Sequence, residues 1–196
     1  QSVPEKLVNL AHHILIHRIE LHGFGCSTHV HDDIRGSAFG NHAPHFCVST
    51  RRSNIIELQG DALINGQRLR QQQFIQAGDS LETGPGSSLI FVIGSSSFQM
   101  RQNTRLTVER GSALNVVSLL RLVTGAVASV WGKGPVREIT TPTLTAGIRG
   151  TGVYTEVFSQ QGYRSYFCNC YGTVDLHAGS DKAVSQAVYH QAFWGE

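Results

Sequence analysis

The chain has 196 residues and a formal net charge of +2, a length that supports one folded domain with an appendage. Only 15% of the residues are charged and 21 are glycine, which is typical of a turn-rich β protein. The small charge, with no basic cluster beyond Arg51 and Arg52, excludes an electrostatically driven nucleic-acid-binding protein. No apolar run reaches the ~18 residues that a membrane span needs.

Residues 1–53 are expected to form a short helix followed by a His- and Cys-rich arm. Leucine, isoleucine and alanine recur at helical spacing between Pro4 and Leu21, and glycines then end the pattern. Thiols and imidazoles follow at a spacing that suits zinc or another borderline-soft metal. The candidate ligands of this arm are Cys26, His29, His31, His42, His45 and Cys47. The alternative is a polar arm whose two cysteines pair as a disulfide or stay free.

From residue 54 onward the sequence predicts short β-strands. Asn65-Gly66 is a strong hairpin signal, and further turn residues recur at about the 8–12-residue spacing of all-β folds. Residues 113–130 contain both leucines and β-branched residues, and the β-branched content favours strands. We expect a β domain over residues 54–180 and a C-terminal tail over residues 181–196.

Three segments in this β domain resemble the FecR domain, an exported module named after the ferric-citrate transport regulator. They are residues 78–84 (GDSLETG), 122–127 (LVTGAV) and 141–151 (TPTLTAGIRGT). The third segment is the most specific. The chain is most similar to stand-alone FecR members that carry a Cys-x-Cys-Tyr-Gly sequence, here residues 168–172, and a His-containing tail, here residues 189–192.

The resemblance implies an all-β fold, an extended β-sheet or β-solenoid-like module in the periplasm or at the bacterial cell surface. It also implies a sensor, anti-sigma or envelope-binding role rather than an enzymatic one. Expected partners are a protein or a cell-envelope component, or further copies of the chain in a homo-oligomer. Neither nucleic acid nor a membrane span is expected.

Cys168 and Cys170 are the sharpest candidates for chemistry. On a strand, residues two apart point to the same face, but their separation does not suit an unstrained disulfide. Together with His190 or His177 they would supply three or four ligands for zinc or cuprous copper. Two alternatives stay open: the cysteines are small buried residues, or they pair with Cys26 or Cys47.

The turn Arg149-Gly150-Thr151-Gly152 favours a structural interpretation. Two glycines allow a positive φ or close backbone approach. Arg149 could bind an anion with its guanidinium fork, but we expect it to fix the turn by bonding carbonyls or an acidic neighbour such as Glu156.

The leading hypothesis is a non-enzymatic, exported FecR-like binding module with a metal site at Cys168, Cys170 and His190. The second is a structural subunit whose exposed sheet edges pair with neighbouring copies. The third is a metal-dependent hydrolase that uses the Cys/His sites. No catalytic residue is assigned, because no nucleophile has a His-Asp partner at a telling spacing and no Walker-type loop is present.

Overall fold

A computed structural model describes residues 53–111 and 116–196 of the chain. These residues form fourteen strands and one short 3-10 turn, so the all-β prediction is confirmed. The predicted helix at residues 4–21 and the His/Cys-rich arm lie outside the described residues. No helix in the described part of the chain is long and apolar enough to cross a membrane.

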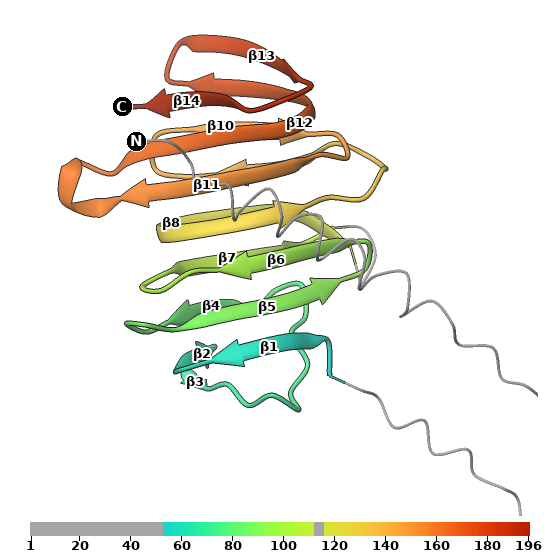
Figure 1. The fold of residues 1–196 in the computed structure, drawn as a ribbon, viewed down its shortest axis with the longest axis vertical. Helices are drawn as coiled ribbons and strands as arrows, with labels where there is room; N and C mark the ends of the chain where they lie inside the picture. The colour runs from blue at the N-terminus through green and yellow to red at the C-terminus, as the bar shows by residue number, and fades with distance from the viewer. Residues whose placement is uncertain (1–52, 112–115) are drawn as a thin grey trace, which may run out of the picture.

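The strands form two sheets that face each other, and within each sheet the strands follow one another along the long axis of the molecule (Figure 1). Sheet A contains β1 (Ile55–Gln59), β5 (Ser88–Ile93), β6 (Ser96–Met100), the second half of β8 (Val117–Val130), β11 (Gly152–Phe158), the first half of β12 (Arg164–Ala178) and β14 (Gln191–Gly195). Its strands face the viewer in Figure 1.

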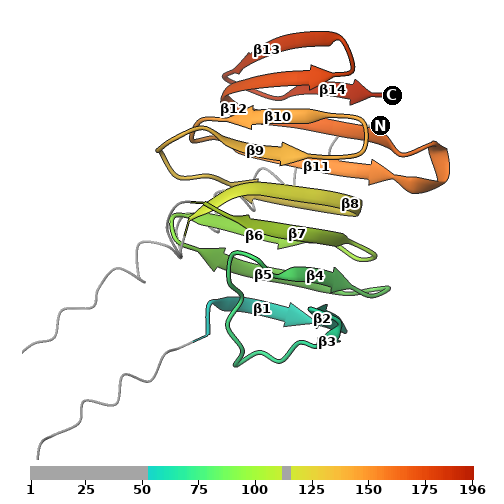
Figure 2. The same cartoon turned by 180° about the vertical axis from the view of Figure 1, so that it is seen from behind.

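Sheet B is seen from the other side in Figure 2. It contains β3 (Gln67–Arg68), β2 (Ala62–Ile64), β4 (Ser80–Thr83), β7 (Arg105–Arg110), the first half of β8, β9 (Arg137–Thr140), β10 (Thr145–Ile148), the second half of β12 and β13 (Asp181–Ala187). Neighbouring strands are antiparallel except for the parallel pair of β8 and β9.

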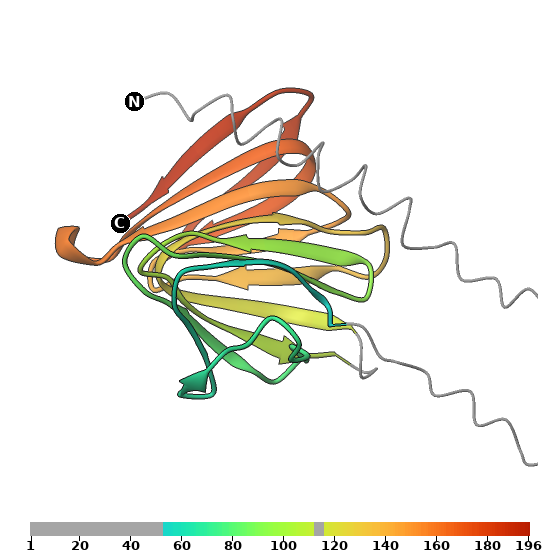
Figure 3. The same cartoon turned by 60° about the horizontal axis from the view of Figure 1, so that its bottom comes forward.

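The hydrophobic core lies between the two sheets, which Figure 3 shows facing each other. Alternate residues of each strand point inward; in β7, for example, Leu106 and Val108 are buried and their neighbours are not. The aromatic rings of Phe91 and Phe98 stack with centroids 5.1 Å apart, and Trp131 packs edge-on against Phe98 at 5.2 Å. Burial of these side chains supplies the main stabilisation of the fold.

Two long strands pass from one sheet to the other and join them. β8 leaves sheet B and enters sheet A at Gly125, while β12 leaves sheet A and enters sheet B at Gly172. Both glycines have a positive φ, +77° and +90°, which lets the strand bend where other residues would be strained. β11 lies between these two strands in sheet A and pairs with both of them. Its last residues pair with β8 at Gly125, and its first residue pairs with Tyr171 of β12, beside Gly172, so the two bends lie at opposite ends of β11.

Several local predictions can be compared with these strands. Asn65 and Gly66 have φ values of 51° and 77° and form the predicted turn, between β2 and β3. β1 pairs with β5 and not with the next strand in sequence. Of the ambiguous region at residues 113–130, residues 117–130 form one continuous strand, β8, and residues 113–115 lie outside the described residues.

Residues 181–196, which we expected to be a tail, form β13 and β14 and belong to the two sheets. β13 pairs with the second half of β12, and β14 pairs with the first half. The last part of the chain therefore follows β12 around its bend and ends both sheets.

Candidate metal site

A cluster of two thiols and one imidazole lies beside the bend of β12. The possible ligand atoms of Cys168, Cys170 and His190 all lie within 4.8 Å of one another. Cys168 and Cys170 share the outer face of sheet A, as their spacing on a strand predicts. Within residues 53–111 and 116–196, this is the one group of three or more His, Cys, Asp or Glu residues with such a geometry.

His190 reaches the cluster because β14 follows the first half of β12. Ala192 pairs with Cys168 and Gln191 pairs with Asn169, so His190 comes just before the paired segment. Its Nδ1 lies 3.7 Å from the Sγ of Cys168. A zinc ion about 2.3 Å from sulfur and about 2.0 Å from nitrogen, at a tetrahedral or trigonal angle, requires these atoms to be about 3.5–3.7 Å apart. The observed separation therefore fits a shared ion.

A buried polar network under the bend holds the cluster in place. Asn169 lies between the two cysteines, points to the inner face and is fully buried. Its amide nitrogen donates to the carbonyl of Gly172 and to the hydroxyl of Ser185, at 2.9 Å in each case. The Ser185 hydroxyl in turn donates to the side chain of Gln191 at 2.6 Å. These bonds fix β12, β13 and β14 to one another, and so fix the backbone that carries all three candidate ligands.

The turn before β11 packs against the same bend. Thr151 is fully buried, and its hydroxyl donates to the Asn169 side chain at 3.4 Å. Gly150 has a φ of +70°, and the ring of Tyr171 lies so close to Gly152 that a Cβ there would meet it at 2.5 Å. Arg149 donates to Asp175 at 2.9 Å, so its acidic partner is Asp175 and not Glu156. These contacts of the turn are thus with β12 of the same chain.

Cys168 is fully buried although it belongs to the outer face of its sheet. It pairs across the strands with Tyr154 on one side and Ala192 on the other, and the side chains of Tyr166 and Cys170 pack in the same cluster. The three neighbouring groups Cys170, His190 and Tyr166 are therefore its immediate polar environment. Both cysteines are free thiols in the structure.

This environment separates the protonation behaviour of the two thiols. The hydrogen bond from Cys170, with a further contribution from His190, lowers the pKa of Cys168 from 9.0 to about 6, although burial opposes the shift. The pKa of Cys170 is raised, first because it donates to Cys168 and then because it is buried. Burial, and then the nearby Cys168, raises the pKa of Tyr166 to about 12. The cluster thus favours ionisation of Cys168 over ionisation of Cys170.

The other sequence candidates do not join this cluster. His177 lies beyond the bend, on the half of β12 that belongs to sheet B, where it pairs with Lys182 and Thr145. It is exposed and is not one of the clustered ligands. Cys26, His29, His31, His42, His45 and Cys47 lie outside the described residues.

Sequence reasoning missed three residues that hold the site, namely Asn169, Ser185 and Gln191. A small polar residue between two cysteines gives a weak signal, since alternation places it inward. Ser185 and Gln191 gave none, because they lie in the segment that we expected to be a tail.

No protein-family model matches the chain, and no curated protein matches it. Two crystal structures of a candidate anti-sigma factor from Parabacteroides distasonis are similar in fold. The first has a TM-score of 0.50 at 9% identity and covers 60% of this chain and 56% of that chain. The second has a TM-score of 0.49 at 8% identity, covering 60% and 57%. The match spans a little over half of each of those structures, and at such identity it concerns the fold alone.

Proposed function

We propose that this chain is an exported, non-enzymatic, FecR-like binding module that holds zinc or cuprous copper between Cys168, Cys170 and His190. The observation that carries the proposal is the convergence of two sulfur atoms and one imidazole nitrogen within 4.8 Å. Thiolate and imidazole are the ligands that these two ions prefer. The FecR resemblance in the 141–151 segment and the fold likeness to an anti-sigma factor candidate support the binding role.

The surroundings of the cluster favour metal retention over catalysis. Cys168 is fully buried, so its sulfur is closed to attack on a substrate, although the imidazole beside it could activate a thiol. The same burial shields a bound ion from water on one side. The Asn169 network ties together the strands that carry the three candidate ligands.

The partner that we propose is a protein or a component of the cell envelope. The formal net charge of the chain is only +2, which gives little electrostatic driving force for binding nucleic acid. A metal ion that fixes His190 would also fix the turn between β13 and β14, the outermost strands of both sheets. The ion would thereby stabilise the surface that these strands offer.

The direct test is metal content and free thiols measured together on the purified, non-reduced full chain. We expect about one zinc or copper per chain and full recovery of the thiols after denaturation and chelation. Absence of metal after reconstitution with both ions would contradict the proposal. A turnover that disappears on chelation would instead favour the metal-dependent hydrolase.

A second function, as a structural subunit, is favoured by a different observation. Val184, Val188, Tyr189 and Trp194 are large, exposed side chains on or beside the two terminal strands. An edge strand with exposed apolar side chains can pair with another chain. Light scattering distinguishes the two functions: an assembly subunit would elute as large particles with and without chelator, whereas the binding module would remain a small species.

A further inference from the structure

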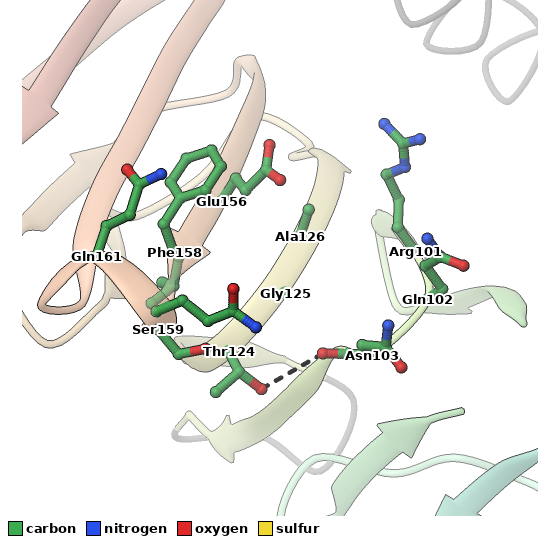
Figure 4. A pocket seen from close by; sticks show the side chains of 12 residues that line it. Arg101, Gln102, Asn103, Thr124, Gly125, Ala126, Glu156, Phe158, Ser159 and Gln161 are labelled. Atoms are coloured by element: carbon green, nitrogen blue, oxygen red, sulfur yellow. Dashed lines mark hydrogen bonds between the residues drawn. The ribbon is translucent and has the colours of Figure 1, made fainter. Parts of the chain in front are cut away.

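A second candidate site is an open pocket of about 450 Å³ at the other end of β11. It lies where β8 bends at Gly125, between the loop after β6 and the 3-10 turn η1 (Ser159–Gln161). Figure 4 shows its side chains, which come from three separate segments of the chain: residues 101–103, 124–126 and 156–161. The volume is within the ~300–1,000 Å³ range of small-molecule sites.

Small residues leave this pocket open. Ala126 lies at its centre, between Arg101 on one side and Glu156 on the other (Figure 4). Glu156 pairs across the strands with Ala126, so no large side chain from β8 fills the space beside the carboxylate. Gly125, the residue at the bend, also lines the pocket next to Ala126, and neither residue has a side chain large enough to fill it.

The lining is polar but electrically balanced. Eight of its side chains can form hydrogen bonds, and the only charged ones are one cation and one anion: Arg101, Gln102, Asn103, Thr124, Glu156, Ser159, Gln160 and Gln161. Opposite charges cancel, so the pocket favours a neutral ligand. Amide groups both donate and accept, which suits a ligand whose groups do the same.

Many of these groups are available to a ligand. Within the described residues, the side chains of Asn103 and of the η1 turn make no hydrogen bond to other protein groups. Gln102, in contrast, accepts from the amide of Gly86, and Thr124 donates to the carbonyl of Asn103. Glu156 is held in position by the hydroxyl of Tyr154, which donates to Oε2 at 2.8 Å. That bond uses one carboxylate oxygen and leaves the other free to accept.

One aromatic ring completes the site. Phe158 is half-buried and lines the pocket, and Figure 4 shows its ring beside Glu156. Trp194 packs against this ring with centroids 5.8 Å apart, which fixes its orientation. An oriented ring suits the apolar C–H face of a sugar, while hydroxyl groups on the sugar's rim both donate and accept hydrogen bonds.

We propose that this pocket binds a neutral saccharide, with Phe158 stacking on the sugar ring and Glu156, Arg101 and the amides of η1 bonding its hydroxyls. A zwitterion would use the two charged groups but not the aromatic face or the amides. The site is separate from the Cys168 cluster, and the proposal does not depend on a metal.

The test is calorimetric titration of the full chain with maltotriose, cellotriose and chitotriose. Each sugar is added to tens of millimolar, which is about ten times or more a dissociation constant near 1 mM. We expect saturable binding of at least one trisaccharide. Phe158→Ala should weaken it about tenfold or more, the loss of one aromatic contact. Tyr189→Ala, which removes an exposed aromatic side chain outside the pocket, should leave it unchanged.

A second variant and a fluorescence signal separate a folding defect from lost binding. Glu156→Ala should weaken binding of the same trisaccharide, while the unfolding curve of this variant keeps its cooperative form. Trp194 is half-exposed whereas Trp131 is buried, so ligand at Phe158 should change the Trp194 emission. Absence of binding for all three sugars would overturn the proposal, as would equal binding by wild type and Phe158→Ala. Loss of binding in Cys168→Ser would also contradict it, because the two sites would then not be separate.

Discussion

The two bends that join the sheets use the same backbone solution for different purposes. At Gly125 the Thr104 hydroxyl satisfies the backbone of the bend: it accepts from the amide of Ala126 at 3.0 Å and donates to the Ala126 carbonyl at 3.1 Å. At Gly172 the inner side is satisfied in the same way, by Asn169. On its outer side, however, two thiols and an imidazole face one another, with the Tyr166 hydroxyl beside Cys168.

The difference between the two bends lies on their outer sides. A bend that is satisfied on its inner side is stable by itself, so residues on its outer side are free to serve another purpose. At Gly125 the residues on the outer side are small and leave a pocket. At Gly172 the residues on the outer side are two cysteines and a histidine, which could ligate a soft metal ion. The following variants test this contrast, beginning with the one of largest effect.

Cys168→Ser should abolish metal retention, because a hydroxyl is a poor replacement for a thiolate ligand of zinc or cuprous copper. Cys26→Ser should retain metal at the wild-type level, and so should His177→Ala, the matched imidazole on the other half of β12. Metal-to-protein ratios after dialysis measure all three. Equal loss in Cys168→Ser and Cys26→Ser would show that the N-terminal arm shares the site, and no loss in either would remove the metal hypothesis.

Gly125→Ala should lower the free energy of unfolding by about 3–5 kcal/mol, measured by urea denaturation. The new Cβ would have a φ of +77° and would meet the Thr104 Cα at 2.5 Å and the Asn103 carbonyl at 2.6 Å. Gly66→Ala is the control, since it has the same φ with nothing within 4 Å. It should cost only about 1–2 kcal/mol. Equal losses would show that packing at the bend does not matter.

Gly172→Ala should cost less than Gly125→Ala, about 1–3 kcal/mol. Its φ is +90°, but the nearest atom to a new Cβ is the Thr151 Cβ at 3.0 Å, against 2.5 Å and 2.6 Å to backbone atoms at Gly125, so a smaller shift relieves the contact. The same change should weaken metal binding, because it alters the bend that aligns Cys170 with His190. If Gly172→Ala is destabilised but keeps full metal affinity, the geometry of the bend does not determine metal binding.

The smallest effect is in the protonation of the metal-free cluster. Ultraviolet absorbance should show one thiolate appearing as the pH rises through about 6 rather than 9.0. Cys170→Ala and His190→Ala should both raise this pKa, the first by more. Since the folded-state pKa is lowered, the contribution of this ionisation to stability is complete above 9.0 and is lost as the pH falls through about 6. An unchanged pKa in both variants would contradict the described environment of Cys168.

Much of the fold could be predicted from local chemistry. Asn65-Gly66 specifies its turn through its backbone preference, and the β-branched content of β8 specifies a strand. The pairing of β1 with β5 could not be predicted, because it depends on contacts between distant segments. The strands after Asp181 were missed for the same reason: their short, weakly apolar pattern is stabilised by pairing with β12.

The candidate site was predictable only in part. Strand alternation was enough to place Cys168 and Cys170 on one face. The choice between His190 and His177 was not predictable, because it depends on the bend at Gly172 and on the path of β14, and both are set by tertiary packing. The Asn169 network likewise joins residues of three strands whose pairing no local pattern reveals.

The central claim is that Cys168, Cys170 and His190 bind one metal ion together, and X-ray absorption spectroscopy of the zinc-loaded full chain tests it most directly. We predict two sulfur ligands at about 2.3 Å and at least one nitrogen at about 2.0 Å. Replacing His190 with alanine should remove the imidazole scattering and keep both sulfurs. A first shell of nitrogen and oxygen alone would contradict the account.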